Sequence, residues 1–306
     1  MDNPARARFL RQVVALTGAL LARPSRSGQR ESVERTAMNQ RLIPSTRQPL
    51  PVIGCGTWIG FDVADGSPEF AALRDVVGLL LAGGGTVLDS SPMYGRSEAV
   101  TGNLLAEQPG RAFVATKVWI SGRDAGIRQM KQSMALLGKV DLMQVHNLLD
   151  WKTHLPTMRA WKAEGRIRYV GVSHYTASAY RELEAVLRAE PLDFVQVNYA
   201  IDDREAESRI LPLAAERGIA VLVNRPFGGG GLLRRLGNRP LPDWAGDAGA
   251  TSWAQLLLRF TLSHPAVTCV IPGTGNPKHM AENVAAGTGA IPDPAFWKAR
   301  IDEVVG

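Results

Sequence analysis

The 306-residue sequence has few cysteines, few histidines and no long apolar run. Its two cysteines exclude the disulfide framework of a small secreted domain. It also lacks the H-E-x-x-H and C-x-x-C motifs of common metal sites and the G-x-S-x-G turn of serine hydrolases, so we expect no metal. No stretch reaches the ~20 apolar residues that a membrane-spanning helix needs, so stable membrane insertion is not expected.

Residues 48–306 also lack any excess of charge. The first 47 residues hold nine arginines, no lysine and three acidic residues, which accounts for the whole net charge of +6. The remainder has 26 basic and 26 acidic residues. Because nucleic-acid binding requires a basic patch or stripe, a nucleic-acid partner is disfavoured. The charge pattern divides the chain into a basic segment, residues 1–47, and a neutral domain, residues 48–306.

The basic segment resembles an export signal followed by a linker. The arginine-rich stretch Arg6–Arg11 precedes an apolar stretch, Val13–Ala22, and a polar, arginine-rich run follows. The apolar stretch is too short to span a bilayer. The string RARFLR is similar to a twin-arginine signal, which predicts a periplasmic or otherwise exported protein.

Two positions depart from the pattern of an export signal. Ala7 stands where the second arginine is expected, and Leu20 stands where a cleavage signal has a small residue. Two alternatives therefore stay open. The segment is a basic amphipathic tail, or it is an upstream extension of a cytoplasmic protein that starts at Met38.

The neutral domain alternates apolar strand-like runs with amphipathic helical segments. The expected strands are Val52–Trp58, Thr86–Ser91, Ala112–Val118, Asp141–Asn147, Ile167–Tyr175, Asp193–Ile201, Ala220–Phe227 and Val267–Thr274. Such alternation requires parallel strands and right-handed crossovers. Eight units in about 250 residues predict a single-domain α/β fold, the (β/α)8 TIM barrel. The alternative, an open doubly wound sheet, would normally carry G-x-G-x-x-G after its first strand, and this chain does not.

Two features of the strands and loops leave questions open. The glycine- and proline-rich stretch Gly228–Gly249 is expected to be the longest irregular loop. Cys55 and Cys269 fall on strands one and eight, which are neighbours in a closed barrel. They are interpreted as two buried thiols, although an exported protein could oxidise them if their geometry allowed it.

Ionisable residues stand at the carboxyl ends of three apolar strands, where barrels carry their chemistry. Asp89 ends the second expected strand, Lys117 the third and His146 the fourth, and Tyr94 follows Asp89 in a loop. Since a buried charge is costly unless paired, we expect Asp89 and Lys117 to form an ion pair. That pair alone could also be purely structural.

Five short motifs resemble those of aldo-keto reductases and occur in the same order. They are Asp89-Ser-Ser-Pro-Met-Tyr94-Gly, Thr116-Lys117, Val145-His146, Gly171-Val-Ser173 and Ile271-Pro272-Gly273. The resemblance implies an NAD(P)H-dependent enzyme that reduces aldehydes or ketones to alcohols, with Tyr94 as the general acid. In this interpretation Lys117 lowers the pKa of Tyr94, Asp89 orients Lys117, and His146 donates a hydrogen bond to the substrate oxygen.

The same resemblance implies a set of cofactor contacts. Ser173, His174 and Gln196 match positions that hold the nicotinamide amide, and Tyr199 matches its stacking aromatic. The expected phosphate contacts are Arg225, Pro226 and Gly228 along the pyrophosphate, and Gly273, Thr274, Asn276, Lys278 and Asn283 around the adenosine phosphate. His174 replaces the usual asparagine, and Arg225 replaces a commoner small residue. Lys278 and His279 favour NADPH, with NADH as the alternative.

Aromatic residues are expected to form the wall of the substrate pocket. Trp58 and Trp119 match pocket positions in relatives, and Asn147 stands where relatives vary. Trp151 fits either the pocket or packing on the barrel rim. An apolar pocket favours an uncharged carbonyl compound as the small-molecule partner, and we expect a monomer. The alternative function is a cofactor-binding sensor or regulatory subunit with little turnover.

Overall fold

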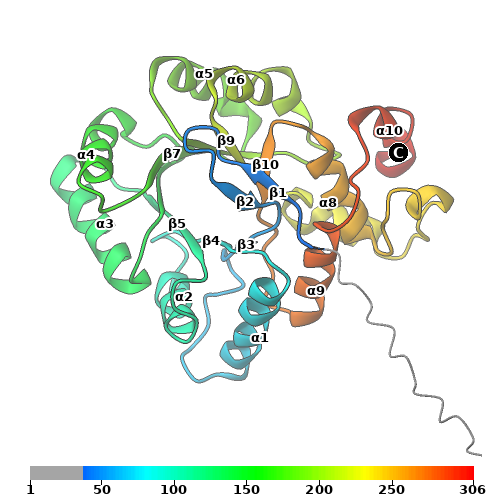
Figure 1. The fold of residues 1–306 in the computed structure, drawn as a ribbon, viewed down its shortest axis with the longest axis horizontal. Helices are drawn as coiled ribbons and strands as arrows, with labels where there is room; N and C mark the ends of the chain where they lie inside the picture. The colour runs from blue at the N-terminus through cyan, green and yellow to red at the C-terminus, as the bar shows by residue number, and fades with distance from the viewer. Residues whose placement is uncertain (1–36) are drawn as a thin grey trace, which may run out of the picture. The chain divides into compact units, whose positions relative to one another are not determined.

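The structure, a computed structural model, describes residues 37–306. The predicted export signal therefore lies outside the described residues. Eight parallel strands follow one another in chain order around a barrel (Figure 1). They are β3 (Cys55–Gly56), β4 (Val87–Asp89), β5 (Phe113–Val118), β6 (Leu142–His146), β7 (Tyr169–Ser173), β8 (Phe194–Asn198), β9 (Ala220–Asn224) and β10 (Val267–Val270). Parallel bridges from Ile53 to Val270 and from Gly56 to Gly273 join the first strand to the last. The predicted (β/α)8 barrel is confirmed.

A helix follows each barrel strand and covers its outer face (Figure 1). These helices are α1 (Pro68–Ala82), α2 (Ser97–Ala106), α3 (Arg123–Leu137), α4 (Trp151–Ala163), α5 (Tyr180–Ala189), α6 (Ile210–Arg217), α8 (Trp253–Ser263) and α9 (Pro277–Ala286). Local sequence explains where they begin. In α1, for example, the Ser67 hydroxyl accepts the Phe70 N–H, and Pro68 occupies the first helical position. Among residues 37–306, none of the helices is both long and apolar enough to cross a membrane.

Side chains alternate between the barrel interior and the helix layer, except where a register shift between Val267 and Cys269 interrupts the pattern in β10. The interior is filled by an apolar cluster that includes Phe113, Tyr169 and Phe194, whose ring centroids lie 5.3, 5.7 and 5.9 Å apart. Val195 and Val197, the odd-numbered residues of β8, belong to the outer cluster under the helices. Side chains of a strand alternate between its two faces with a period of two residues. An inward-facing residue that follows the filled interior layer therefore lies at the carboxyl end of the barrel. This end holds the candidate site.

A two-stranded hairpin closes the amino end of the barrel. Strands β1 (Gln40–Leu42) and β2 (Pro49–Pro51) pair antiparallel, and their Ile43 and Leu50 join the interior cluster. The Arg41 guanidinium donates to the carbonyl oxygens of Leu262 and His264, at 2.5 and 2.9 Å, and to that of Val267. The predicted boundary after residue 47 cuts through this hairpin, so residues 38–47 belong with the barrel rather than with the basic segment.

The stretch predicted as an irregular loop, Gly228–Gly249, contains short helices. These are η3 (Gly228–Gly230), α7 (Gly231–Leu236) and η4 (Asp243–Ala245). Other short helices are η1 (Ala177–Ala179), η2 (Glu205–Ser208), α10 (Pro294–Lys298) and α11 (Ile301–Val305). The apolar Leu232 and Leu236 of α7 are buried, which explains why a glycine-rich start does not prevent a helix here.

The two cysteines lie on adjacent strands but are not paired. Both are free and buried. Cys55 packs in the outer cluster, whereas Cys269 points into the barrel interior. Their side chains therefore project to opposite faces of the sheet, a geometry that a disulfide does not allow.

Candidate active site

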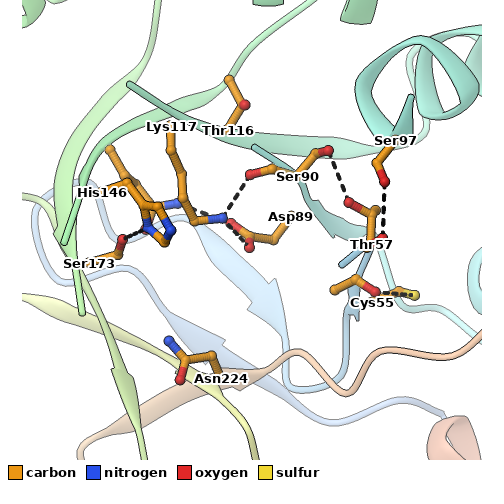
Figure 2. Close-up of polar contacts among 12 residues, drawn as sticks. Cys55, Thr57, Asp89, Ser90, Ser97, Thr116, Lys117, His146, Ser173 and Asn224 are labelled. Carbon is orange, nitrogen blue, oxygen red and sulfur yellow. Dashed lines mark hydrogen bonds and ion pairs between the residues drawn. The ribbon is translucent and has the colours of Figure 1, made fainter. Parts of the chain in front are cut away.

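The predicted ion pair lies at the carboxyl end of β4 and β5. The Lys117 ammonium is fully buried and lies 2.6 Å from an Asp89 carboxylate oxygen (Figure 2). It also donates to the Ser90 carbonyl at 2.7 Å. The second Asp89 oxygen accepts a hydrogen bond from Gln144 Nε2 at 3.0 Å, so both carboxylate oxygens are engaged. Burial lowers the pKa of Lys117, but Asp89 and Tyr94 together outweigh it, and the net shift is upward.

Tyr94 lies beside this pair in the loop after β4. The Lys117 ammonium lies 5.1 Å from the centre of the Tyr94 ring. Burial raises the pKa of the Tyr94 phenol, and Lys117 opposes that rise without reversing it. The expected lowering of this pKa below its ordinary value is therefore not observed. The phenol is protonated at neutral pH and has a proton to donate.

His146 completes the predicted group of four. Its ring meets that of Tyr94 edge-on, with centroids 6.3 Å apart, and Trp119 lies 6.4 Å away on another side. Its Nδ1 lies 2.9 Å from the Ser173 hydroxyl (Figure 2). Burial, followed by the charge of Lys117, lowers the pKa of His146 to about 3, so the imidazole is neutral at physiological pH.

Besides Ser91 Oγ and Gln144 Oε1, three amide side chains at this end of the barrel each keep one buried polar atom without a partner among residues 37–306. They are Gln196 Nε2 on β8, Asn224 Oδ1 on β9 and Asn147 Oδ1 after β6. Buried amides are normally hydrogen-bonded, so unpaired donors and acceptors at a barrel's carboxyl end indicate a ligand site. One donor and two acceptors are what a carboxamide such as that of nicotinamide requires. The donor set fits a nicotinamide cofactor.

Asn224 begins the run Asn224–Gly228 that resembles the pyrophosphate segment, but sequence reasoning assigned it no contact of its own. Its Nδ2 donates to the His174 carbonyl at 3.1 Å, and its Oδ1 has no partner among residues 37–306. A signal was present in the sequence. Ala220 and Leu222 are interior residues of β9, and Asn224 follows them at the same two-residue spacing.

Tyr199 does not reach the site, contrary to its expected role as a stacking aromatic. It is fully buried, packs against Phe260 and His264, and donates its hydroxyl to Glu207 at 2.6 Å. Tyr199 lies three residues after Gln196. An odd spacing on a strand turns the side chain to the opposite face, here toward the helix layer.

His174 and Arg225 lie against the exposed Tyr175 at the edge of the site. The His174 ring stacks on that of Tyr175 with centroids 5.7 Å apart. The Arg225 guanidinium lies 5.7 Å from the Tyr175 ring centre and donates to the Tyr175 carbonyl at 3.3 Å. Arg225 has a positive φ of 51°, and Pro226 behind it is buried. Arg225 also lies beside Gly229, where a Cβ atom would come within 3.1 Å of its Nη2. Gly228, the first residue of that turn, has a φ of 57°.

The residues expected around the adenosine phosphate come together where α9 begins. The Asn276 side chain caps this helix by accepting the Lys278 N–H at 2.9 Å, and the Thr274 hydroxyl accepts the Asn276 N–H at 3.0 Å. Gly273 packs on Gly56, where a Cβ atom would lie 3.1 Å from the Gly56 carbonyl oxygen. Lys278 and His279 are exposed beside the cap, and Asn283 is buried further along the helix. A capped helix start with an exposed cation suits a phosphate.

Exposed apolar side chains gather around the same end of the barrel. Trp58 and Trp119 are 59% and 40% exposed, and Ile59, Met93 and Ile120 are exposed beside them in sequence. Trp151, in contrast, packs against the outer apolar cluster, as expected for the rim. Among the described residues, no cluster of histidine, cysteine and carboxylate side chains could hold a metal ion.

Comparison with known proteins identifies the family. The aldo/keto reductase family model matches residues 52–304. The chain therefore belongs to the aldo/keto reductase family, whose members are NAD(P)H-dependent oxidoreductases.

Several relatives are similar over most of the barrel. Pyridoxal 4-dehydrogenase of Microbacterium luteolum is 25% identical, over 85% of this chain and 96% of that protein. Aldo-keto reductase YhdN of Bacillus subtilis is 28% identical, over 61% of each chain. The crystal structure of a Klebsiella pneumoniae aldo/keto reductase in complex with NADP and acetate has a TM-score of 0.71 at 26% identity, covering 89% of this chain and 95% of that one.

Proposed function

We propose that this protein reduces small, uncharged aldehydes or ketones to alcohols with NADPH, and that Tyr94 supplies the proton. The observation that carries the proposal is the arrangement of Tyr94 and a neutral His146 around a buried Lys117–Asp89 pair. The unpaired Gln196 Nε2 and Asn224 Oδ1 lie at the same end of the barrel and support a cofactor there.

Tyr94 is suited to act as the general acid. Its raised pKa keeps the phenol protonated at neutral pH, so a proton is available when negative charge develops on the carbonyl oxygen. The phenolate that remains lies beside the Lys117 ammonium, which stabilises it. Asp89 keeps that ammonium charged and holds it in place, because both groups are buried and each neutralises the other.

His146 is suited to orient the substrate oxygen. A neutral imidazole donates through one nitrogen only, and the tautomer follows from the partner of the other nitrogen. If the Ser173 hydroxyl donates to Nδ1, the proton resides on Nε2, where it can be donated to the carbonyl oxygen. Trp58 and Trp119 would shield this hydrogen bond from water and favour substrates without charge.

The cofactor residues fit NADPH in three places. Gln196, Asn224, Asn147 and Ser173 would hold the nicotinamide, Arg225 and the turn at Gly228 the pyrophosphate, and the start of α9 the adenosine phosphate. Lys278 and His279 favour the phosphorylated cofactor over NADH because they are exposed cations or donors beside that helix start. When bound, NADPH supplies the hydride for the reduction. The NADP complex of the Klebsiella relative supports this choice.

The test is NADPH oxidation by the purified full chain with a panel of aldehydes, ketones and quinones. Tyr94→Phe should lower kcat by ~10²–10⁴-fold, the usual contribution of a general acid, and leave the NADPH dissociation constant unchanged. Tyr169→Phe is the matched control, since it removes a tyrosine hydroxyl bonded to Gln48 at the other end of the barrel. Full turnover by Tyr94→Phe would contradict the assignment, and NADPH binding without carbonyl-dependent oxidation in the wild type would favour a sensor.

The proposed location and oligomeric state need separate tests. Residues 1–47 support export, and nothing in the barrel requires a second subunit. Fractionation of the native host with N-terminal sequencing should find a mature chain that starts between Ala22 and Met38 outside the cytoplasm. An intact start, or a start at Met38 in the cytosol, would contradict export. Light scattering should give the mass of a monomer.

A further inference from the structure

Asp62, which no part of the proposed mechanism uses, is bonded to the loop that carries Tyr94. We propose that Asp62 is a positioning residue that fixes the Tyr94 phenol relative to Lys117 and His146. The inference rests on the proposed role of Tyr94. It concerns the loop after β3, residues 57–62, and the loop after β4, residues 90–97.

The contacts of Asp62 fall on the two residues that follow Tyr94. One carboxylate oxygen of Asp62 accepts the Arg96 backbone N–H at 3.1 Å and the Arg96 Nε–H at 3.0 Å. The Arg96 guanidinium also donates to the Asp62 carbonyl at 3.4 Å. The Asp62 carboxylate therefore binds both the backbone and the side chain of Arg96. These bonds restrain the backbone two residues after Tyr94.

Gly95 shows how closely the carboxylate lies on the Tyr94 loop. Its φ of 60° is in the left-handed region that favours glycine. A Cβ atom at this position would lie 2.3 Å from one Asp62 oxygen and 2.6 Å from the other. The Asp62 carboxylate therefore packs directly on the Gly95 backbone. Any residue with a Cβ atom at position 95 would clash with it.

The base of the Tyr94 loop is held independently of Asp62. The Thr57 hydroxyl donates to Ser90 Oγ at 2.9 Å, and the Ser97 hydroxyl donates to the Thr57 carbonyl at 3.2 Å (Figure 2). All three residues are buried. Tyr94 is itself bound to this base through its backbone, since its N–H donates to the Ser91 carbonyl at 3.0 Å and its carbonyl accepts the Ser97 N–H at 3.1 Å. Loss of Asp62 should therefore release Gly95 and Arg96 and shift Tyr94 only slightly, while the base of the loop stays folded.

Asp62 itself is fixed by the loop after β3. Phe61 is fully buried, and the Asp62 N–H donates to the Ile59 carbonyl at 3.2 Å. Trp58 and Ile59 of the proposed substrate wall belong to this loop. Gly60 packs on Gly275, where a Cβ atom would lie 3.2 Å from the Gly275 nitrogen. This short loop therefore carries Trp58 and contacts both the loop that bears Tyr94 and Gly275 before α9.

Stability alone gives a weak reason for this ion pair. The side chains of Asp62 and Arg96 are 45% and 58% exposed, and pairs with such exposure contribute little to folding. Position matters more, since a displacement of about 1 Å at a reacting group can cost ~10²-fold in rate. We therefore assign the Asp62–Arg96 contact a role in placing Tyr94 for catalysis rather than in stabilising the fold.

The test compares Asp62→Ala and Asp62→Asn with a matched control. Asp62→Ala should lower kcat about tenfold and leave the carbonyl KM and the NADPH dissociation constant within about twofold. Asp62→Asn keeps an oxygen acceptor for the Arg96 N–H and should recover most of kcat. Glu107→Ala breaks the Arg74–Glu107 pair, which has similar exposure and two bonds of 2.9 Å, and should leave kcat unchanged.

A double-variant cycle with Tyr94→Phe separates the two proposals. If Asp62 acts through Tyr94, Asp62→Ala should have no further effect on kcat in the Tyr94→Phe background. The positioning role would be overturned if Asp62→Ala kept the wild-type kcat, or if it lowered kcat equally in the wild-type and Tyr94→Phe backgrounds. Neither result would affect the proposed role of Tyr94 as general acid. Full turnover by Tyr94→Phe would instead overturn the proposed function.

Discussion

The carboxylates at the amino end of the barrel and the amides at its carboxyl end satisfy their hydrogen-bonding groups to different degrees, and Arg159 Nε is an unpaired exception near the amino end among residues 37–306. At the amino end, Asp141 pairs with Lys139 at 2.8 Å and Arg168 at 3.0 Å, and it accepts the Val114 N–H at 3.0 Å. The Asp193 carboxylate likewise accepts hydrogen bonds from the Lys162 ammonium and from the Val170 N–H. At the carboxyl end, both oxygens of Asp89 and the ammonium of Lys117 also have hydrogen-bond partners, but the amide side chains at this end do not have all of theirs. Gln196, Asn224 and Asn147 each keep an unpaired polar atom.

This difference separates groups that stabilise the fold from groups that await a ligand. A charge that binds backbone N–H groups and a neighbouring cation contributes to folding and leaves nothing for a substrate. A buried amide without a hydrogen-bond partner lowers the stability of the fold. Its presence is explained if a bound ligand supplies the missing partner. Substitutions at the amino end should therefore change stability, and those at the carboxyl end should change turnover or binding.

The largest contrast is expected for one substitution made at both ends, lysine to methionine. Lys117→Met should lower kcat by ~10³-fold, because the phenolate of Tyr94 loses its cation. Lys162→Met should leave kcat unchanged in the same NADPH oxidation assay, since its carboxylate partner is Asp193. Equal losses in both variants would contradict the division of roles.

Stability needs its own control in that experiment, because Lys117→Met leaves Asp89 buried without its cation. Removing one partner of a buried pair costs about 3–5 kcal/mol. The variant Lys117→Met with Asp89→Asn should regain much of that free energy of unfolding in urea titrations. It should not regain turnover. Recovery of both would make Lys117 a structural residue only.

A substitution at the amino end should affect stability and nothing else. Asp193→Ala removes the acceptor of the Val170 N–H and the partner of Lys162. We expect the free energy of unfolding to fall by about 2 kcal/mol, because a buried N–H is left unpaired. Urea unfolding measures this change. The kcat of the folded fraction should equal that of the wild type, and a specific loss of kcat would contradict the comparison.

The opposite result is expected at the carboxyl end for Gln196→Met. This change removes an unpaired buried amide and keeps a side chain of similar shape, so the free energy of unfolding should stay the same or rise. The NADPH dissociation constant, measured by fluorescence titration, should rise about tenfold, which is the loss of one hydrogen bond. A less stable protein with unchanged NADPH binding would remove Gln196 from the cofactor site.

A further prediction concerns the acid dependence of stability. His146 has a pKa of about 3 in the folded protein, against ~6.5 when unfolded. Between these values the unfolded chain binds more protons, so acidification lowers the free energy of unfolding by about 1 kcal/mol per pH unit. Urea unfolding of the cofactor-free protein between about pH 4 and pH 6 should show a shallower slope in His146→Gln. Equal slopes would show that His146 is not held neutral.

The fold and three of the four central residues could be predicted because their physical constraints are local, whereas the role of Tyr94 was implied by the resemblance to aldo-keto reductases. Asp89, Lys117 and His146 each end an apolar strand, and the cost of burying charge already required the Asp89–Lys117 pair. The parallel pairing followed from the alternation of strands with helices. Neither inference needed information about distant contacts.

The missed features depend on contacts that short segments do not reveal. The hairpin of Gln40–Leu42 and Pro49–Pro51 has three-residue strands, too short for a period of two to be recognised. Tyr199 was misassigned and Asn224 was not chosen as a site residue, because a strand end by itself does not tell which side chain faces inward. Counting in steps of two from Phe194 and Leu222 assigns both correctly.

The most direct test of the account is deuterium transfer from NADPH deuterated at the reactive C4 position. The purified full chain is mixed with this cofactor and an aromatic aldehyde, and the alcohol is analysed by mass spectrometry. We expect one deuterium on the carbinol carbon, with the rate of formation reduced at least ~10²-fold in Tyr94→Phe. Tight NADPH binding without deuterated alcohol, or an undiminished rate in Tyr94→Phe, would contradict the central claim.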